Sequence, residues 1–257
     1  MAPDGRRAET DDAAAAPESV AVLRDGAGRL LARWLCTPDR LEDLATGWLV
    51  AEGHAAGLRE VGPLRTVDER TVEAAISPAV ADRILAARRT AGPAPDLADV
   101  RPAGPGAPPR SRPGPALRRL LAEEGALARL FAEGLERGTR RAEGGGIHTG
   151  IRVETEVGEE DHGAAIVDVV EDVSRAAVTD KLVGAALRGG GRLDLSVFLL
   201  TGRISAPIAA KLVRSGVAAA ATLSVPTVLA VEIAAGAGVV LVGRARRGTP
   251  LRYGWPS

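Results

Sequence analysis

The second half of the chain alternates short apolar runs with amphipathic segments, and this alternation constrains the fold more than any other feature. Strand-like runs at 151–157, 164–170, 195–201, 217–223 and 238–243 alternate with helix-like segments at 173–188, 204–215 and 227–236. Such alternation predicts a layered α/β domain with helices packed on one sheet. In open sheets of this kind, ligands bind at the carboxyl ends of the strands, where helices begin.

The segment 164–188 shows one strand–helix unit most clearly. Residues 164–170 are apolar except for Asp168, which predicts a buried strand. Asp172 or Ser174 can cap the helix that follows, and three glycines at 189–191 end it. Arg175 lies in the first turn, where a cation is unfavourable unless an anion is near. Either Arg175 is a solvated residue of an ordinary unit, or the helix start binds an anion.

The rest of the chain predicts a smaller α+β part at 18–90. Hairpins are indicated at 19–35 and 66–76, and helices at 41–53 and 78–89. On the first of these helices we expect Glu42, Asp43 and Glu52 to be solvated. We expect a disordered terminus at 1–17, a Pro/Gly-rich loop at 91–115, and a single helix at 116–134 that opens an α/β domain spanning 116–257.

Composition excludes several classes of protein. The chain carries 33 basic and 33 acidic residues, so no excess charge favours nucleic acid or a membrane surface. Aromatic residues make up 2%, too few for base-stacking platforms. No apolar run is long enough to cross a bilayer, and residues 1–17 do not resemble a secretory signal, so we expect a cytoplasmic protein.

A few rare residues carry further expectations. Cys36 is the single cysteine, so the chain has no internal disulfide and no CxxC pair. Lysine occurs only at 181 and 211. Asp180 and Lys181 are adjacent on a helix and do not face each other, so any ion pair that they make lies elsewhere. His54 and His162 are predicted at the surface.

Five short motifs follow one another along the chain. They are Thr37-Pro38 with LEDLATGWLVAEG at 41–53, EDV at 171–173 with Arg175 and DKLVG at 180–184, TGRIS at 201–205, SVPT at 224–227 with LAV at 229–231, and GRARRGT at 243–249 with Tyr253 and Pro256. Together they resemble the formate dehydrogenase accessory sulfur-carrier (FdhD) family. The resemblance extends from about residue 18 to 256 and is weakest between 60 and 140.

The resemblance implies a three-layer α/β/α fold of the cytidine-deaminase-like type, with the smaller N-terminal α+β part beside it. Family members take sulfur from a cysteine desulfurase as a cysteine persulfide. They pass it to Mo-bis(molybdopterin guanine dinucleotide), which they bind as cargo, for formate dehydrogenase. The HxE…PCxxC zinc pattern of deaminases is absent from this chain, so we expect no metal site and no deaminase chemistry. A homodimer is compatible with the resemblance.

The same resemblance suggests a set of cofactor-binding residues, for which guanosine diphosphate (GDP) would serve as a surrogate ligand. Arginine guanidinium groups match phosphate geometry, and glycines let the backbone approach a ligand closely. The alternatives are a partly buried structural histidine at 148 and a solvated basic turn at 244–247. The residues are Gly145, Gly146, His148, Arg175, Arg203, Ser205, Arg244, Ala245, Arg246, Arg247, Gly248 and Thr249.

The chain departs from the family where the sulfur chemistry is carried. The family's CxxC loop corresponds to about 90–96 here, and that stretch has no cysteine. Ala176 and Ala177 stand where the family has His-Asn, and Gly144 stands where it has Thr. A persulfide requires a thiolate, so we expect no catalytic residue in this chain.

Three hypotheses follow. The chain is an FdhD-type accessory protein that still binds the cofactor but lacks its own persulfide. Alternatively, it is a non-catalytic scaffold or regulator of a molybdoenzyme. The third possibility is a sulfurtransferase that uses Cys36, although a buried structural role for this cysteine is favoured because free cysteines are often buried.

Overall fold

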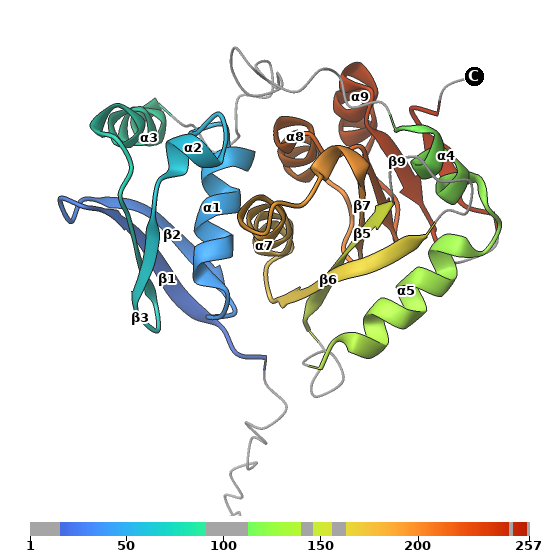
Figure 1. The fold of residues 1–257 in the computed structure, drawn as a ribbon, viewed down its shortest axis with the longest axis horizontal. Helices are drawn as coiled ribbons and strands as arrows, with labels where there is room; N and C mark the ends of the chain where they lie inside the picture. Colours follow the sequence, from blue (N-terminus) through green and yellow to red (C-terminus); the bar gives the residue numbers. More distant parts are fainter. Residues whose placement is uncertain (1–15, 91–112, 140–145, 156–162, 247–248, 256–257) are drawn as a thin grey trace, which may run out of the picture.

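The computed structural model describes residues 16–90, 113–139, 146–155, 163–246 and 249–255, which form two sheets with helices packed around them (Figure 1). A four-stranded sheet has the order β2-β1-β4-β3, and a six-stranded sheet has the order β10-β9-β8-β7-β5-β6. This arrangement confirms the α/β class and the smaller N-terminal α+β part. The expected terminus at 1–17 and loop at 91–115 lie almost wholly outside the described residues.

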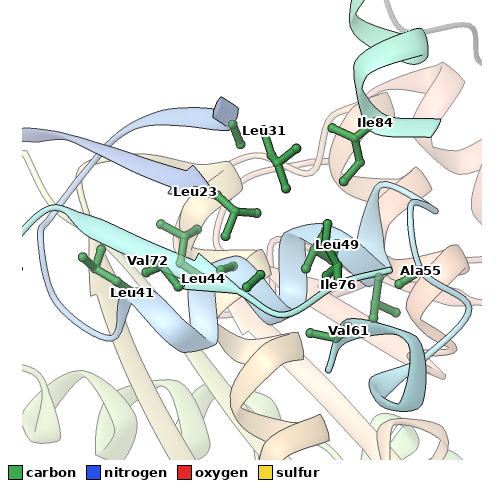
Figure 2. Close-up of a cluster of buried hydrophobic side chains, with 14 of the residues drawn as sticks. Leu23, Leu31, Leu41, Leu44, Leu49, Ala55, Val61, Val72, Ile76 and Ile84 are labelled. Carbon is green, nitrogen blue, oxygen red and sulfur yellow. The ribbon is translucent and has the colours of Figure 1, made fainter. Parts of the chain in front are cut away.

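The N-terminal part consists of two hairpins and three helices. Its elements are β1 (Ser19–Asp25), β2 (Leu30–Cys36), α1 (Leu41–Ala51), α2 (Leu58–Val61), β3 (Leu64–Asp68), β4 (Thr71–Ala74) and α3 (Pro78–Thr90). β1 pairs antiparallel with β2 and parallel with β4. The apolar side of α1 packs on this sheet, where Leu44, Leu49 and Val72 are fully buried (Figure 2). Both hairpins and both longer helices were predicted from their periodicity.

The six-stranded sheet is mixed. Its strands are β5 (His148–Thr155), β6 (Ala164–Asp172), β7 (Ser196–Leu200), β8 (Ala219–Thr222), β9 (Val240–Gly243) and β10 (Leu251–Tyr253). β7, β8 and β9 are parallel, whereas β5 runs antiparallel to both β6 and β7. The start of β5 therefore lies at the same edge as the carboxyl ends of β6, β7, β8 and β9.

Helices cover both faces of this sheet and complete the three layers. On one face lie α7 (Arg175–Arg188), α8 (Ala206–Ser215) and α9 (Val228–Ala237), with Leu182 and Leu212 packed in one core with Phe198. On the other face lie α4 (Pro115–Ala122) and α5 (Ala126–Arg137), whose Phe131 shares a core with Ile151. A short 3-10 turn, η3 (Leu193–Leu195), precedes β7.

Two predictions about these elements were wrong. The segment 116–134 is not one helix, because Gly125 adopts φ +77° and separates α4 from α5. The strand 164–170 is not fully buried, because β6 is the edge strand of the sheet and Val167 is 44% exposed. The unpaired side of β6 is covered by arginines: Arg40 pairs with Asp168 and donates to the Val169 carbonyl, and Arg137 donates to the Ile166 carbonyl. Such covering blocks pairing with another strand.

The two parts of the chain meet where α1 crosses α7. A Cβ atom on Gly47 would lie 1.7 Å from the carbonyl oxygen of Asp180, and one on Gly184 would lie 1.9 Å from that of Asp43. The two helix backbones are therefore in direct contact, which only glycine permits. Figure 1 shows α1 and α7 side by side between the two sheets. Within the described residues, no helix has the length and apolarity needed to cross a membrane.

Candidate functional site

One edge of the six-stranded sheet gathers the loops that the sequence singled out. His148 opens β5 and is paired in register with Asp172 at the end of β6. The loop 201–205 follows β7, the loop 223–227 follows β8, and the segment beginning at Arg244 follows β9. The loops after β6, β7 and β8 each join a strand to a helix, as the alternation predicted. The segment beginning at Arg244 instead joins β9 to β10, and His148 lies at the start of β5.

A small hollow lies at this edge, between β5, α7 and the loop after β7. Its volume is about 220 Å³, including the space open to solvent, of which about 10 Å³ is reachable by the centre of a water molecule. That is room for roughly one water or one ligand oxygen. The lining residues are His148, Thr149, Arg175, Val178, Leu200, Gly202, Arg203 and Ile208.

Gly202 lies between two predicted site residues, Arg175 and His148, and contacts both. A Cβ atom at this position would lie 2.6 Å from Cδ of Arg175 and 3.3 Å from Nδ1 of His148. The absence of a side chain therefore allows Arg175 and His148 to pack against the same backbone. Gly202 was not among the predicted site residues, although its place within the TGRIS motif is a signal that could have indicated it.

Hydrogen bonds between neighbouring strands hold the loop after β7 in place. The Thr222 hydroxyl donates to the Gly202 carbonyl at 2.8 Å, and the Thr149 amide donates to the Thr201 hydroxyl at 2.9 Å. The Thr227 amide donates to the Ile204 carbonyl at 3.0 Å. Because these contacts come from β5, β8 and the start of α9, the loop backbone is fixed from several directions.

Arg175 and Arg203 bring positive charge to this edge. Both are exposed, and neither forms an ion pair within the part of the chain that the structure describes. Ser174 caps α7, its hydroxyl accepting a hydrogen bond from the Ala177 amide at 3.3 Å, which confirms the predicted cap. Ser205 occupies the corresponding cap position of α8 and is half-buried. Helix starts and unpaired guanidinium groups together favour an anion.

The predicted residues after β9 lie apart from this hollow. Arg244 has φ +54°, and its amide donates to the Ser224 carbonyl at 2.7 Å. Ala245 is buried, and its amide donates to the Thr222 carbonyl at 3.0 Å. Ala245, Arg246 and Thr249 line a second hollow of about 1090 Å³, open to solvent, against the turn between α4 and α5. Its other lining residues are Leu121, Ala122, Glu123, Glu124, Gly125, Leu127, Ala128, Pro250 and Arg252.

Six of the predicted site residues divide between the two hollows, whereas Gly146, Ser205 and Arg244 line neither. The small hollow contains His148, Arg175 and Arg203, and the large one contains Ala245, Arg246 and Thr249. Gly146 is exposed, at φ +70°, just before β5. Gly145, Arg247 and Gly248 lie outside the described residues.

Comparison with known proteins decides the family. The family model described as FdhD/NarQ matches residues 18–256. The chain belongs to this family. A sulfur carrier protein FdhD of Xanthomonas oryzae is 30% identical over 264 residues, covering 98% of this chain and 87% of that protein. One from Agrobacterium fabrum is 28% identical over 253 residues, covering 90% and 84%.

Two further relatives complete this comparison. A sulfur carrier protein FdhD of Streptomyces avermitilis is 43% identical over 100 residues, and the match spans 38% of this chain and about a third of that protein's length. A crystal structure of a putative formate dehydrogenase accessory protein from Desulfotalea psychrophila superposes with a TM-score of 0.66, covering 94% of this chain and 88% of that one. At 16% identity that likeness shows that the fold is shared.

In this FdhD/NarQ chain, Cys36 is a core residue. Its side chain is fully buried at the end of β2, in the same core as Leu44 and Leu49. Burial, reinforced by the charge of Asp172, raises the pKa of the Cys36 thiol to about 11. At neutral pH a buried thiol with this pKa is protonated, which disfavours the thiolate that persulfide chemistry requires. The expected structural role of Cys36 is supported.

The two lysines of the chain are buried at the interface between its two parts. Lys181 is fully buried and contacts Asp39 and Asp172, while Lys211 contacts Asp180 and Glu52. Asp180 and Lys181 therefore pair with other residues and not with each other, as predicted.

The expectation that the acidic residues of α1 are solvated was wrong. Arg188 pairs with both Glu42 and Asp43, and Glu52 pairs with Lys211 at 2.6 Å. The helical period places these side chains off the apolar stripe of α1, but it does not reveal that α7 and α8 supply cations there. The charged side of α1 therefore faces α7 and α8 and is partly buried by them.

His54 is half-buried and not a surface residue, contrary to the prediction. Its ring lies 4.6 Å from the Trp48 ring, centroid to centroid. Burial lowers the pKa of His54 to about 4, although the nearby Glu52 carboxylate opposes this change. His54 is therefore neutral at pH 7. His162 lies outside the described residues.

Proposed function

We propose that this chain is an accessory protein for formate dehydrogenase that holds a guanine-dinucleotide form of the molybdenum cofactor, Mo-bis(molybdopterin guanine dinucleotide), as cargo. The observation that carries the proposal is the pair Arg175 and Arg203 beside Gly202, two exposed guanidinium groups without a carboxylate partner among the described residues. Guanidinium groups match phosphate geometry and can bind phosphate oxygens bidentately. The names of the relatives, sulfur carrier protein FdhD and formate dehydrogenase accessory protein, support the same role.

The two hollows fit different parts of such a ligand. The small hollow has room for about one oxygen atom of a phosphate, with Arg175, Arg203 and His148 around it. The large hollow has the volume for a base-sized group, and Arg246 and Thr249 provide polar contacts there. When the cofactor is bound, its molybdenum centre is the group that accepts sulfur. The residues of this chain bind and orient the dinucleotide.

The sulfur itself must come from another protein. Cys36 is the only cysteine of the chain, and its thiol is buried and protonated. The sulfur atom therefore passes to the cargo from a thiol outside this chain, for which a cysteine desulfurase is the proposed donor. The accessory protein would act by presenting the cofactor to that donor and then to formate dehydrogenase.

Calorimetric titration with GDP tests the proposal. We expect GDP to bind the parent protein, and both Arg203→Ala and Arg175→Ala to weaken binding by about tenfold or more, the effect of one charge-assisted hydrogen bond. Arg246→Ala tests the second hollow in the same way. Arg33→Ala is the control, because Arg33 is exposed on β2 of the other sheet. Absence of heat with GDP at millimolar concentration would refute the proposal.

A scaffold without nucleotide affinity is the second candidate, and one feature of α9 favours it. This helix is apolar on nearly all sides, with Glu232 as its one charged residue, yet Val228 is 76% exposed and Leu229 is 43% exposed. An apolar surface of this kind suits a protein partner, including a second copy of the chain. Retention of formate dehydrogenase by the immobilised protein, lost in Val228→Glu, together with no GDP binding, is the result that would favour the scaffold.

A further inference from the structure

We propose that Lys181 is a positioning residue through which the N-terminal part of the chain controls the geometry of the small hollow. Lys181 does not line the hollow. It holds the connector 172–174, which leads from β6 into α7 and presents Arg175. This inference rests on the proposed function, because its main measurement is the affinity for GDP.

The ammonium group of Lys181 joins three oxygen atoms from two parts of the molecule. Nζ lies 2.6 Å from Oδ1 of Asp39 and 3.0 Å from the carbonyl oxygen of Thr37, both in the connector between β2 and α1. It lies 2.7 Å from Oδ2 of Asp172, at the end of β6. An ammonium group has three donors on one atom, whereas the planar fork of arginine does not suit three convergent oxygens.

The connector after β6 is fixed residue by residue around this ammonium group. Oδ1 of Asp172 accepts a hydrogen bond of 2.7 Å from the Ser174 amide, and Ser174 caps α7. The Val173 amide donates to the Thr37 hydroxyl at 3.3 Å. The backbone direction at Arg175 therefore depends on contacts that the N-terminal part supplies.

Asp172 is also the strand neighbour of His148, which lines the hollow. It lies directly opposite His148 in the antiparallel pairing of β5 with β6, and directly opposed residues project from the same face of a sheet. Asp172 is fully buried, and Oδ2 has no hydrogen-bond partner among the described residues apart from its ion pair with Lys181. Removing the ammonium group leaves an unpaired buried carboxylate at the strand position opposite His148, and this carboxylate must take up a proton or move.

Lys211 provides a matched control within the same interface. It is also buried, and it also contacts two carboxylates: Nζ lies 2.8 Å from Oδ1 of Asp180 and 2.6 Å from Oε1 of Glu52. These partners lie within α7 and at the end of α1, and neither belongs to the connector before Arg175. Substitution of either lysine removes a buried cation that pairs with two carboxylates. Only Lys181 contacts the connector 172–174.

The experiment compares Lys181→Met with Lys211→Met in the full chain. Thermal unfolding should show a similar loss of stability in both variants. GDP affinity should fall about tenfold or more in Lys181→Met, as in Arg175→Ala, and stay within about twofold of the parent value in Lys211→Met. A double variant with Arg175→Ala should bind no more weakly than Arg175→Ala alone, because Lys181 acts through Arg175. Equal GDP affinity in the two lysine variants, or additive losses in the double variant, would overturn the inference.

A second measurement does not depend on GDP. Hydrogen exchange of the ligand-free protein should be faster at the amides of residues 173–177 in Lys181→Met than in the parent, and unchanged there in Lys211→Met. Unchanged exchange at 173–177 in Lys181→Met would overturn the inference. Failure of the parent to bind GDP would instead refute the proposed function.

If Lys181→Met does not fold, a second variant tests the same contact. Asp39→Ala removes one of the three oxygen atoms around Nζ, at a partly exposed position, and is measured in the same way.

Discussion

The small hollow and the crossing of α1 over α7 both contain charged side chains, but these side chains differ in burial and in pairing. At the crossing, Lys181 and Lys211 are buried and each contacts two carboxylates. At the hollow, Arg175 and Arg203 are exposed and have no carboxylate partner within the described residues. A buried charge needs a partner in the protein, whereas an exposed cation at a helix start can take its partner from a ligand. Pairing thus distinguishes charges that organise the fold from charges available for binding.

Two glycines, Gly47 at the helix crossing and Gly202 at the hollow, differ in a similar way. Gly47 lies against the backbone of α7, which cannot move without separating the two parts of the chain. Gly202 lies against the side chain of Arg175, which is exposed. An added methyl group should therefore affect stability at the first position and binding at the second.

The largest effect is expected from Gly47→Ala. The new Cβ would lie 1.7 Å from the Asp180 carbonyl oxygen, so the helices must separate. We expect a loss of about 3 kcal/mol or more, at the upper end of overpacking costs, despite the better helix propensity of alanine. Urea unfolding measures it. Gly26→Ala is the control, because nothing lies within 4 Å of its Cβ position. Equal stability of Gly47→Ala and the parent would contradict the close crossing.

His54 should make the α1 end of the interface sensitive to acid. Its folded pKa of about 4 lies below the ordinary value of 6.5, so the unfolded chain binds the extra proton first. Stability from this residue is complete above pH 6.5 and falls as the pH drops toward 4, by up to about 3 kcal/mol. Urea unfolding at pH 7 and pH 4.5 should show the loss in the parent and a smaller one in His54→Gln. An identical loss in both proteins would exclude His54 as its source.

Gly202→Ala should separate binding from stability. The added Cβ would lie 2.6 Å from Cδ of Arg175 and would displace that side chain from the hollow. We expect GDP affinity to fall by about tenfold while unfolding stability changes by less than about 1 kcal/mol, because a flexible exposed side chain can move. Calorimetry and urea unfolding measure the two quantities. A stability loss as large as that of Gly47→Ala would show that the loop after β7 is as rigid as the helix crossing.

The smallest effect is expected at Cys36. Because its thiol is buried and has a pKa of about 11, alkylation at pH 8 should be very slow in the folded protein and fast in denaturant. Cys36→Ala should leave GDP affinity unchanged. Mass spectrometry after incubation with a cysteine desulfurase and cysteine should detect no added sulfur on Cys36. An added sulfur atom there would restore the sulfurtransferase hypothesis.

Much of this architecture follows from local sequence patterns. Apolar periodicity predicted most helices and strands, and the helix cap was narrowed to Asp172 or Ser174, because these features depend on residues close together in the chain. The carboxyl ends of parallel strands share one sheet edge, so the loops beginning at 171, 201 and 224 could be placed together before their contacts were known. The motifs in those loops also indicated the family that the comparisons established.

Contacts between distant segments were decided only by the tertiary structure. The sequence around Glu42, Asp43 and Glu52 does not show that Arg188 and Lys211 neutralise them, because these partners lie more than a hundred residues away. The sequence also does not show that Arg203 and Arg246 line different hollows. One hollow lies beside α7 and the other beside the turn between α4 and α5, on opposite faces of the sheet. Local periodicity determines which side of a helix is apolar, whereas the partner of each buried charge depends on which elements pack together in three dimensions.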